Sequence, residues 1–183
     1  MPSIRQTLLA GALVLSTVSV GALAANPMVG GAAMYPSKTI VENAVNSKDH
    51  TTLVAAVKAA GLVDTLSGAG PFTVFAPTDA AFAKLPAGAV DNLVKPENKA
   101  MLTGVLTYHV VPGRVTAQMI AANARAHRGT ATYNTVQGEP LMFSRSGTGW
   151  MIMDRKGNRG MITIANVMQS NGVIHVIDTV MMP

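Results

Sequence analysis

The sequence predicts an α+β protein in which short helices come first and a run of strands comes last. Apolar residues recur at helical spacing through most of positions 37–124, and they alternate with a period of two from position 130 to the C-terminus. Phe72–Ala76 and Thr107–Val111 read as strands within the helical part. Because helices and strands are largely segregated, the pattern favours α+β over the β-α-β alternation of a parallel sheet.

The first 24 residues have the pattern of a secretory signal peptide. Arg5 precedes an apolar run over 8–20, and Ala22-Leu23-Ala24 gives a small-residue cleavage signal. A membrane anchor is the alternative, but about 13 apolar residues are short against the ~20 of a spanning helix. We therefore expect a signal peptide at 1–24, and a secreted or periplasmic protein that meets a membrane only through that cleaved segment.

Two further units complete the predicted domain organisation. Pro27 and the Gly30-Gly31 pair indicate a flexible leader over 25–36, and a single domain occupies 37–183. The chain has no cysteine, so its stability must come from packing and hydrogen bonds rather than from disulfides. We expect a monomer.

Local signals place the first elements in order. Gly61 is suited to end the helix that begins after His50. Pro77 cannot donate to a sheet, so the strand Phe72–Ala76 must stop there, and Thr78 can cap the next helix. The expected helical segments are 39–45, 51–60, 62–66, 80–85, 88–94, 96–106 and 117–124.

Period-two segments separated by turn residues make up the second part. The Asn171-Gly172 pair between two apolar runs is a strong hairpin signal. Phe72–Ala76 lies among helices, so it must pair with distant strands, including the C-terminal one, to satisfy its backbone groups. The expected later strands are Thr130–Val136, Pro140–Arg145, Trp150–Asp154, Met161–Val167 and Val173–Met181.

Four stretches resemble the signatures of the fasciclin domain family: Thr73–Phe82, Leu106–Gly113, Thr135–Gly138 and Asn171–Pro183. The resemblance implies a wedge of about seven β-strands with helices packed around it. It also implies a secreted or surface-attached module for cell adhesion and matrix contact, without enzymatic activity. Some algal and cyanobacterial relatives bind carotenoids, so a carrier of a small apolar ligand such as a carotenoid or lipid is the alternative function.

Tyr108 and His109 are the adhesion candidates that the resemblance implies, because this pair is implicated in integrin binding in animal relatives. The alternative is a structural role. In a strand one of the two side chains points inward, and a buried Tyr or His needs a hydrogen-bond partner.

A basic block between Gly113 and Gly160 is the most specific feature outside the signatures. Its positive residues face only two acids, Glu139 and Asp154, which gives a local net charge of +5. The block is either a solvated surface or a basic face that contacts an acidic polysaccharide or another cell-surface or envelope component. Nucleic acid is excluded by the compartment and by an aromatic content of 4%. The candidate residues are Arg114, Arg125, Arg128, Arg145, Arg155, Lys156 and Arg159.

The remaining chemistry-bearing residues do not form a recognisable site. The four histidines show no H-x-x-x-H spacing, so no metal and no cofactor is expected. The twelve methionines could serve as soft ligands for Cu(I), and Met151 and Met153 share one strand face. Their irregular spacing favours gap-filling in the core instead. No G-x-S-x-G motif occurs and no serine has a recognisable base beside it, which argues against an enzyme.

Overall fold

The computed structural model describes residues 26–183, so the predicted signal peptide lies outside the described residues. In chain order the elements are β1 (Met28–Val29), β2 (Ala32–Ala33), α1 (Ile40–Ala44), α2 (Thr51–Ala60), α3 (Val63–Ser67), β3 (Phe72–Pro77), α4 (Asp79–Ala83), α5 (Ala89–Leu93), the 3₁₀ turn η1 (Pro96–Asn98), α6 (Lys99–Tyr108), β4 (Val110–Pro112), α7 (Ala117–Ala126), β5 (Thr130–Asn134), β6 (Pro140–Ser146), β7 (Gly149–Met153), β8 (Arg159–Gln169) and β9 (Gly172–Ile177).

A mixed seven-stranded sheet organises the chain, in the order β4-β3-β9-β8-β7-β6-β5. β3 runs parallel to β9, in a register that pairs Phe72 with Gly172 and Pro77 with Ile177. All other neighbours in this sheet are antiparallel. The predicted α+β class is confirmed, and so is the predicted pairing of the early strand with the C-terminal one.

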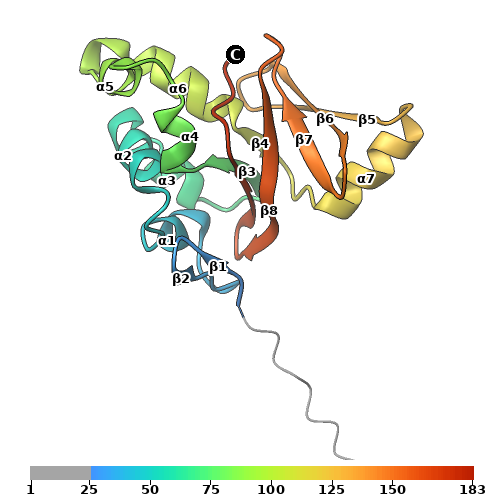
Figure 1. The fold of residues 1–183 in the computed structure, drawn as a ribbon. Coiled ribbons are helices and arrows are strands. Elements are labelled where there is room, and N and C mark those ends of the chain that lie inside the picture. The colour runs from blue at the N-terminus through green and yellow to red at the C-terminus, as the bar shows by residue number, and fades with distance from the viewer. Residues whose placement is uncertain (1–25) are drawn as a thin grey trace, which may run out of the picture.

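Helices cover this sheet in two groups (Figure 1). Helices α1 to α6 gather beside β3, and α7 lies against β5 to β7. One core cluster fills the space beneath the first group, with Leu53, Val74 and Leu102 among its members. A second cluster lies beneath α7 and includes Ile120 and Phe143. The sheet curls until β4 approaches the end of β5, where the Val136 N–H donates to the Val110 carbonyl oxygen at 2.7 Å.

Several predicted signals act as expected. Thr78 Oγ1 accepts the Ala81 N–H at 3.2 Å and caps α4 directly after β3 ends. Gly61 ends α2 in the left-handed conformation, with a φ of 73°. Asp79 has a further role that the sequence does not suggest, because its carboxylate accepts the Thr52 N–H at 2.8 Å and caps α2.

The predicted flexible leader over 25–36 is wrong for most of its length. Residues 28–33 form the β1–β2 hairpin, and Val29 and Met34 are only 4% and 2% exposed. The Lys48 N–H donates to the Gly30 carbonyl oxygen, which holds the hairpin to the segment after α1. Burial of these apolar side chains outweighs the local flexibility of the glycine pair.

The predicted strand Thr107–Val111 is also wrong in its first half. Helix α6 continues to Tyr108, and only Val110–Pro112 joins the sheet. The buried stripe of Leu102, Val105 and Leu106 extends in helical register to Tyr108, so packing overrides the local strand propensity. Among the described residues, no helix combines the length and apolarity needed to cross a bilayer.

Candidate functional site

Tyr108 lies at the end of α6, and its side chain is fully buried. Its hydroxyl donates to the Pro140 carbonyl oxygen at 2.9 Å and accepts the Arg155 N–H at 3.1 Å. Burial raises the pKa of this phenol, which therefore stays protonated and can donate. Tyr108 thus joins the start of β6 to the β7–β8 turn.

His109 follows as the C-cap of α6 and is 2% exposed. Nδ1 lies 2.8 Å from the Val105 carbonyl oxygen, so it carries the proton and donates. Nε2 then accepts the Met181 N–H at 3.0 Å. Burial lowers the pKa of His109 to about 4, which keeps the ring neutral and able to accept that bond.

The C-terminal tail is held by a second buried group. Asp154 is fully buried and accepts the Met182 N–H at 2.9 Å and the Asn158 N–H at 2.9 Å. Tyr108 and His109 therefore tie the tail and two strand ends to α6. Both side chains are buried, so they are not accessible to a binding partner in this conformation.

The basic residues of the block lie at several separate places. Arg114 donates to the carbonyl oxygens of Gln169 and Ser170 at 3.3 and 3.4 Å, at a site of its own. The Ser146–Gly149 and Asp154–Asn158 turns lie at opposite ends of β7, because β7 pairs antiparallel with both neighbours. These ends are separated by roughly 16 Å at the usual rise per residue. The turn that follows β7 carries Arg155 and Lys156, and Arg159 begins β8 beside it; Arg145 lies at the other end of β7.

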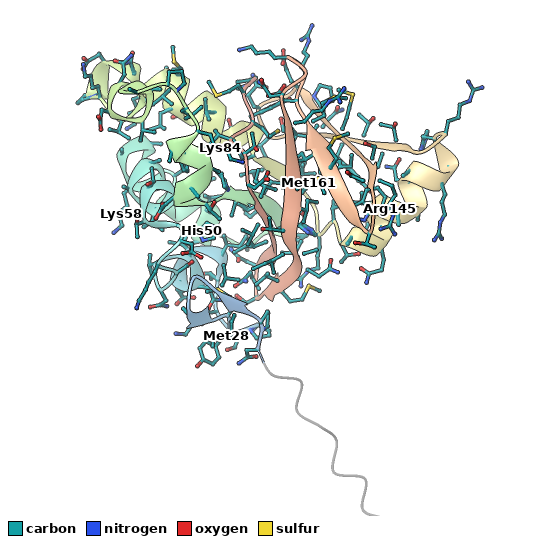
Figure 2. All side chains as sticks on the ribbon, in the orientation of Figure 1. Met28, His50, Lys58, Lys84, Arg145 and Met161 are labelled. Carbon is teal, nitrogen blue, oxygen red and sulfur yellow. The ribbon has the colours of Figure 1, made fainter. Side chains whose placement is uncertain are left out.

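Arg125 and Arg145 line an open groove of about 450 Å³ between α7 and strands β7 and β8. Arg145 is directly opposite Trp150 in the β6–β7 register, and its guanidinium carbon lies 4.7 Å from the indole ring centroid. Arg145 Nη1 also donates to the Thr148 carbonyl oxygen at 2.9 Å. Figure 2 shows Arg145 beside α7. The stacking and the hydrogen bond hold one guanidinium in place at the groove.

Ion pairing distinguishes this groove from the turn at the other end of β7. Arg155 Nη1 lies 2.6 Å from Glu139 Oε1, so its charge is already matched. Within residues 26–183 the other ion pair joins Lys84 and Asp178, and neither pair involves Arg125 or Arg145. The two groove arginines therefore keep donors available for an anion.

Trp150 lines this groove and was not among the candidate residues of the sequence analysis. A usable signal existed, because a four-residue turn between the two predicted strands places position 150 opposite Arg145. The polar side chains of Gln118, Thr148 and Thr163 complete the lining. Their positions depend on α7 and β8 packing together, which local sequence does not specify.

An apolar cavity lies between α1, α2, α6 and β3. Its lining is mainly aliphatic and includes Ile40, Leu53 and Leu106, and its volume is about 40 Å³. That volume is far below the ~300–1,000 Å³ of typical small-molecule pockets. A carotenoid or lipid chain therefore needs the helices to move apart before it can enter.

The histidines occupy separate sites. His175 is fully buried, its Nε2 lies 2.8 Å from the Val115 carbonyl oxygen, and its ring stacks on Phe75 at 5.3 Å. In the part of the chain that the structure describes, no three His, Cys, Asp or Glu side chains come together as a possible metal site.

Comparison with known proteins decides the family. The model of the fasciclin domain matches residues 48–183. This chain belongs to the fasciclin domain family. A solved structure of a FAS1 domain pair from the insect cell adhesion molecule Fasciclin I is similar in fold. Its TM-score is 0.71 at 17% identity, over 80% of this chain and 51% of that one.

Curated relatives extend the similarity to bacterial proteins. The chain is 48% identical to Protein sll1483 of Synechocystis sp., over 85% of this chain and 79% of that protein. It is 36% identical to the Immunogenic protein MPB70 of Mycobacterium bovis, over 76% of this chain and 66% of that protein. It is 34% identical to the Cell surface glycolipoprotein MPB83 of the same species, over 90% of this chain and 64% of that protein. The family and these relatives support the predicted adhesion-related, non-enzymatic role.

Proposed function

We propose that this fasciclin-domain protein is exported and contacts an acidic polysaccharide of a cell surface or envelope through the groove flanked by Arg125 and Arg145. The observation that carries the proposal is that both arginines line an open groove and take part in no ion pair described above. The name of one relative, a cell surface glycolipoprotein, supports the proposed location outside the cell.

The chemistry of the groove suits carboxylate or sulfate groups on a sugar chain. A guanidinium presents a planar set of donors that can bind such a group through two parallel hydrogen bonds. Arg145 is already ordered by Trp150 and by the Thr148 carbonyl, so binding costs it less conformational entropy. Hydroxyl and amide side chains between the arginines can bond to sugar hydroxyls.

Retention on an immobilised polyuronate or sulfated glycan tests the proposal. The double variant Arg125→Gln/Arg145→Gln should elute at clearly lower salt than the parent. The matched control, Lys156→Gln/Arg159→Gln, removes the same net charge at the other end of β7. It should elute close to the parent, because charge at that end does not line the groove.

Two outcomes contradict the proposal. Equal losses in both double variants would mean that only net charge matters, and elution of the groove variant with the parent would mean that the groove does not bind. Thermal unfolding of both variants checks that they are folded, since exposed charge changes normally alter stability by less than ~0.5 kcal/mol.

The carrier alternative has its own measurement. Protein purified from its native source should be colourless and yield no lipid on extraction, because the apolar cavity of about 40 Å³ holds neither. A coloured or lipid-loaded protein would favour the carrier function instead.

A further inference from the structure

Four methionines gather on one face of the β6–β8 part of the sheet. Met142 is directly opposite Met153 across β6 and β7, and Met151 is directly opposite Met161 across β7 and β8. Met151 and Met153 are two residues apart on β7, so their side chains point to the same side. We call these four residues the methionine face, and Figure 2 labels Met161 on β8.

The core does not explain this arrangement. The alternating residues Phe143, Trp150 and Ile152 point to the other side and belong to the core cluster beneath α7. The four methionines belong to neither core cluster and are half-buried. Gap-filling in the core, the expected role of the methionines, therefore fails for this group. The water-facing side of an antiparallel sheet normally carries polar residues instead.

Thioethers at this spacing form a set of soft, neutral ligands. Directly opposite residues have their Cβ atoms ~5 Å apart, and residues two apart on a strand are separated by ~7 Å. Three rotatable bonds per methionine allow the sulfur atoms to turn toward a common point. Soft thioether ligands select Cu(I) among the common metal ions.

We propose that the methionine face binds Cu(I) through the thioethers of Met151, Met153 and Met161, with Met142 beside them. The charged neighbours are Arg159, which lies directly opposite Met153, and the Lys84–Asp178 ion pair, whose carboxylate accepts the Met161 N–H at 2.7 Å. Arg145 and Trp150, which define the glycan groove, lie on the other face of these strands, and Met161 Cε reaches Gly149 at the end of that groove.

Neutral thioethers also give the site a distinguishing property. Histidine and cysteine ligands must lose a proton to bind a metal, so their affinity falls in mild acid. A thioether has no proton to lose. Binding of Cu(I) should therefore be the same at pH 7 and pH 5.

Competition with a coloured Cu(I) chelator under reducing, anaerobic conditions measures the affinity of the purified protein. The triple variant Met151→Leu/Met153→Leu/Met161→Leu should bind at least 10-fold more weakly than the parent, while Leu conserves volume and keeps the fold. The matched control, Met28→Leu/Met101→Leu/Met119→Leu, removes three exposed methionines on separate elements and should bind like the parent.

A second measurement needs no substitution. In protein carrying ¹³C-labelled methionine methyl groups, titration with Ag(I), a redox-stable substitute for Cu(I), should shift the methyl signals of the methionine face and leave that of Met101 in place. Uniform shifts at all methionines, no shifts, or equal affinity of the parent and the triple variant would each overturn the proposal.

Discussion

Acid should destabilise this protein through His109, and the amount can be worked from the structure. The pKa of His109 is lowered to about 4 by burial, against 6.5 in an unfolded chain. The unfolded state therefore binds more protons between these values, so stability is complete above pH 6.5 and falls as pH drops toward 4. At 1.36 kcal/mol per unit of pKa, the full loss is about 3 kcal/mol, and most of it is reached by pH 4.5.

The variant His109→Gln isolates this contribution. A glutamine amide can donate to the Val105 carbonyl and accept the Met181 N–H, as His109 does, but it does not titrate. Urea unfolding followed by the fluorescence of Trp150, the single tryptophan, gives the free energy of unfolding at each pH. Between pH 7 and pH 4.5 the variant should lose about 2 kcal/mol less than the parent.

Other titrating groups do not obscure the comparison. Burial also lowers the pKa of His50 and His175, so both add an acid loss of the same sign, but they are present in parent and variant alike. Equal acid losses in His109→Gln and the parent would refute the reasoning.

Two further substitutions test the packing and capping described above. Gly172→Ala should cost about 3 kcal/mol in urea unfolding, because its Cβ would collide with the Phe72 carbonyl oxygen between β3 and β9. The control Gly104→Ala, on an open face of α6, should be neutral or stabilising. Equal effects of the two substitutions would contradict the close approach of β3 and β9. Asp79→Ala should cost about 1 kcal/mol of unfolding free energy, because it removes the cap of α2. The control Asp91→Ala, at an exposed position, should stay within ~0.5 kcal/mol of the parent. A matching loss in both variants would argue against capping.

The parts of the fold that follow from local chemistry could be predicted. Pro77 ends β3 because it lacks an N–H, and Thr78 caps the next helix because its hydroxyl can accept one. The pairing of β3 with β9 followed from a general requirement, since a strand among helices must satisfy its backbone elsewhere. The first two inferences need only the residue and its immediate neighbours, and the third needs only the rule that buried backbone groups are hydrogen-bonded.

The errors arose where distant packing decides. Tyr108 has strand-like neighbours, yet α6 carries it into the core, where its hydroxyl meets Pro140 and Arg155. Val29 and Met34 flank flexible glycines, yet both are buried under the first helices. Local composition indicates the conformation that a segment prefers in isolation. The conformation of these segments is set instead by packing against parts of the chain that come later.

The basic block shows that closeness in sequence is a poor guide to a surface. Arg145 and Arg155 are ten positions apart, but consecutive turns of an antiparallel sheet lie at its opposite ends. The predicted alternation of strands and turns was sufficient to separate them. What it could not provide was the position of α7 against the sheet, which brings Arg125 to the groove from a different part of the chain.

The same alternation makes the two proposals independent of each other. Arg145 and Trp150 point to one side of the β6–β8 strands, and Met151 and Met161 point to the other. Leucine substitutions on the methionine face should therefore leave glycan retention unchanged, and glutamine substitutions in the groove should leave Cu(I) affinity unchanged. If either set alters both properties, the effect passes through the stability of the shared strands, and neither site could be assigned from binding losses alone.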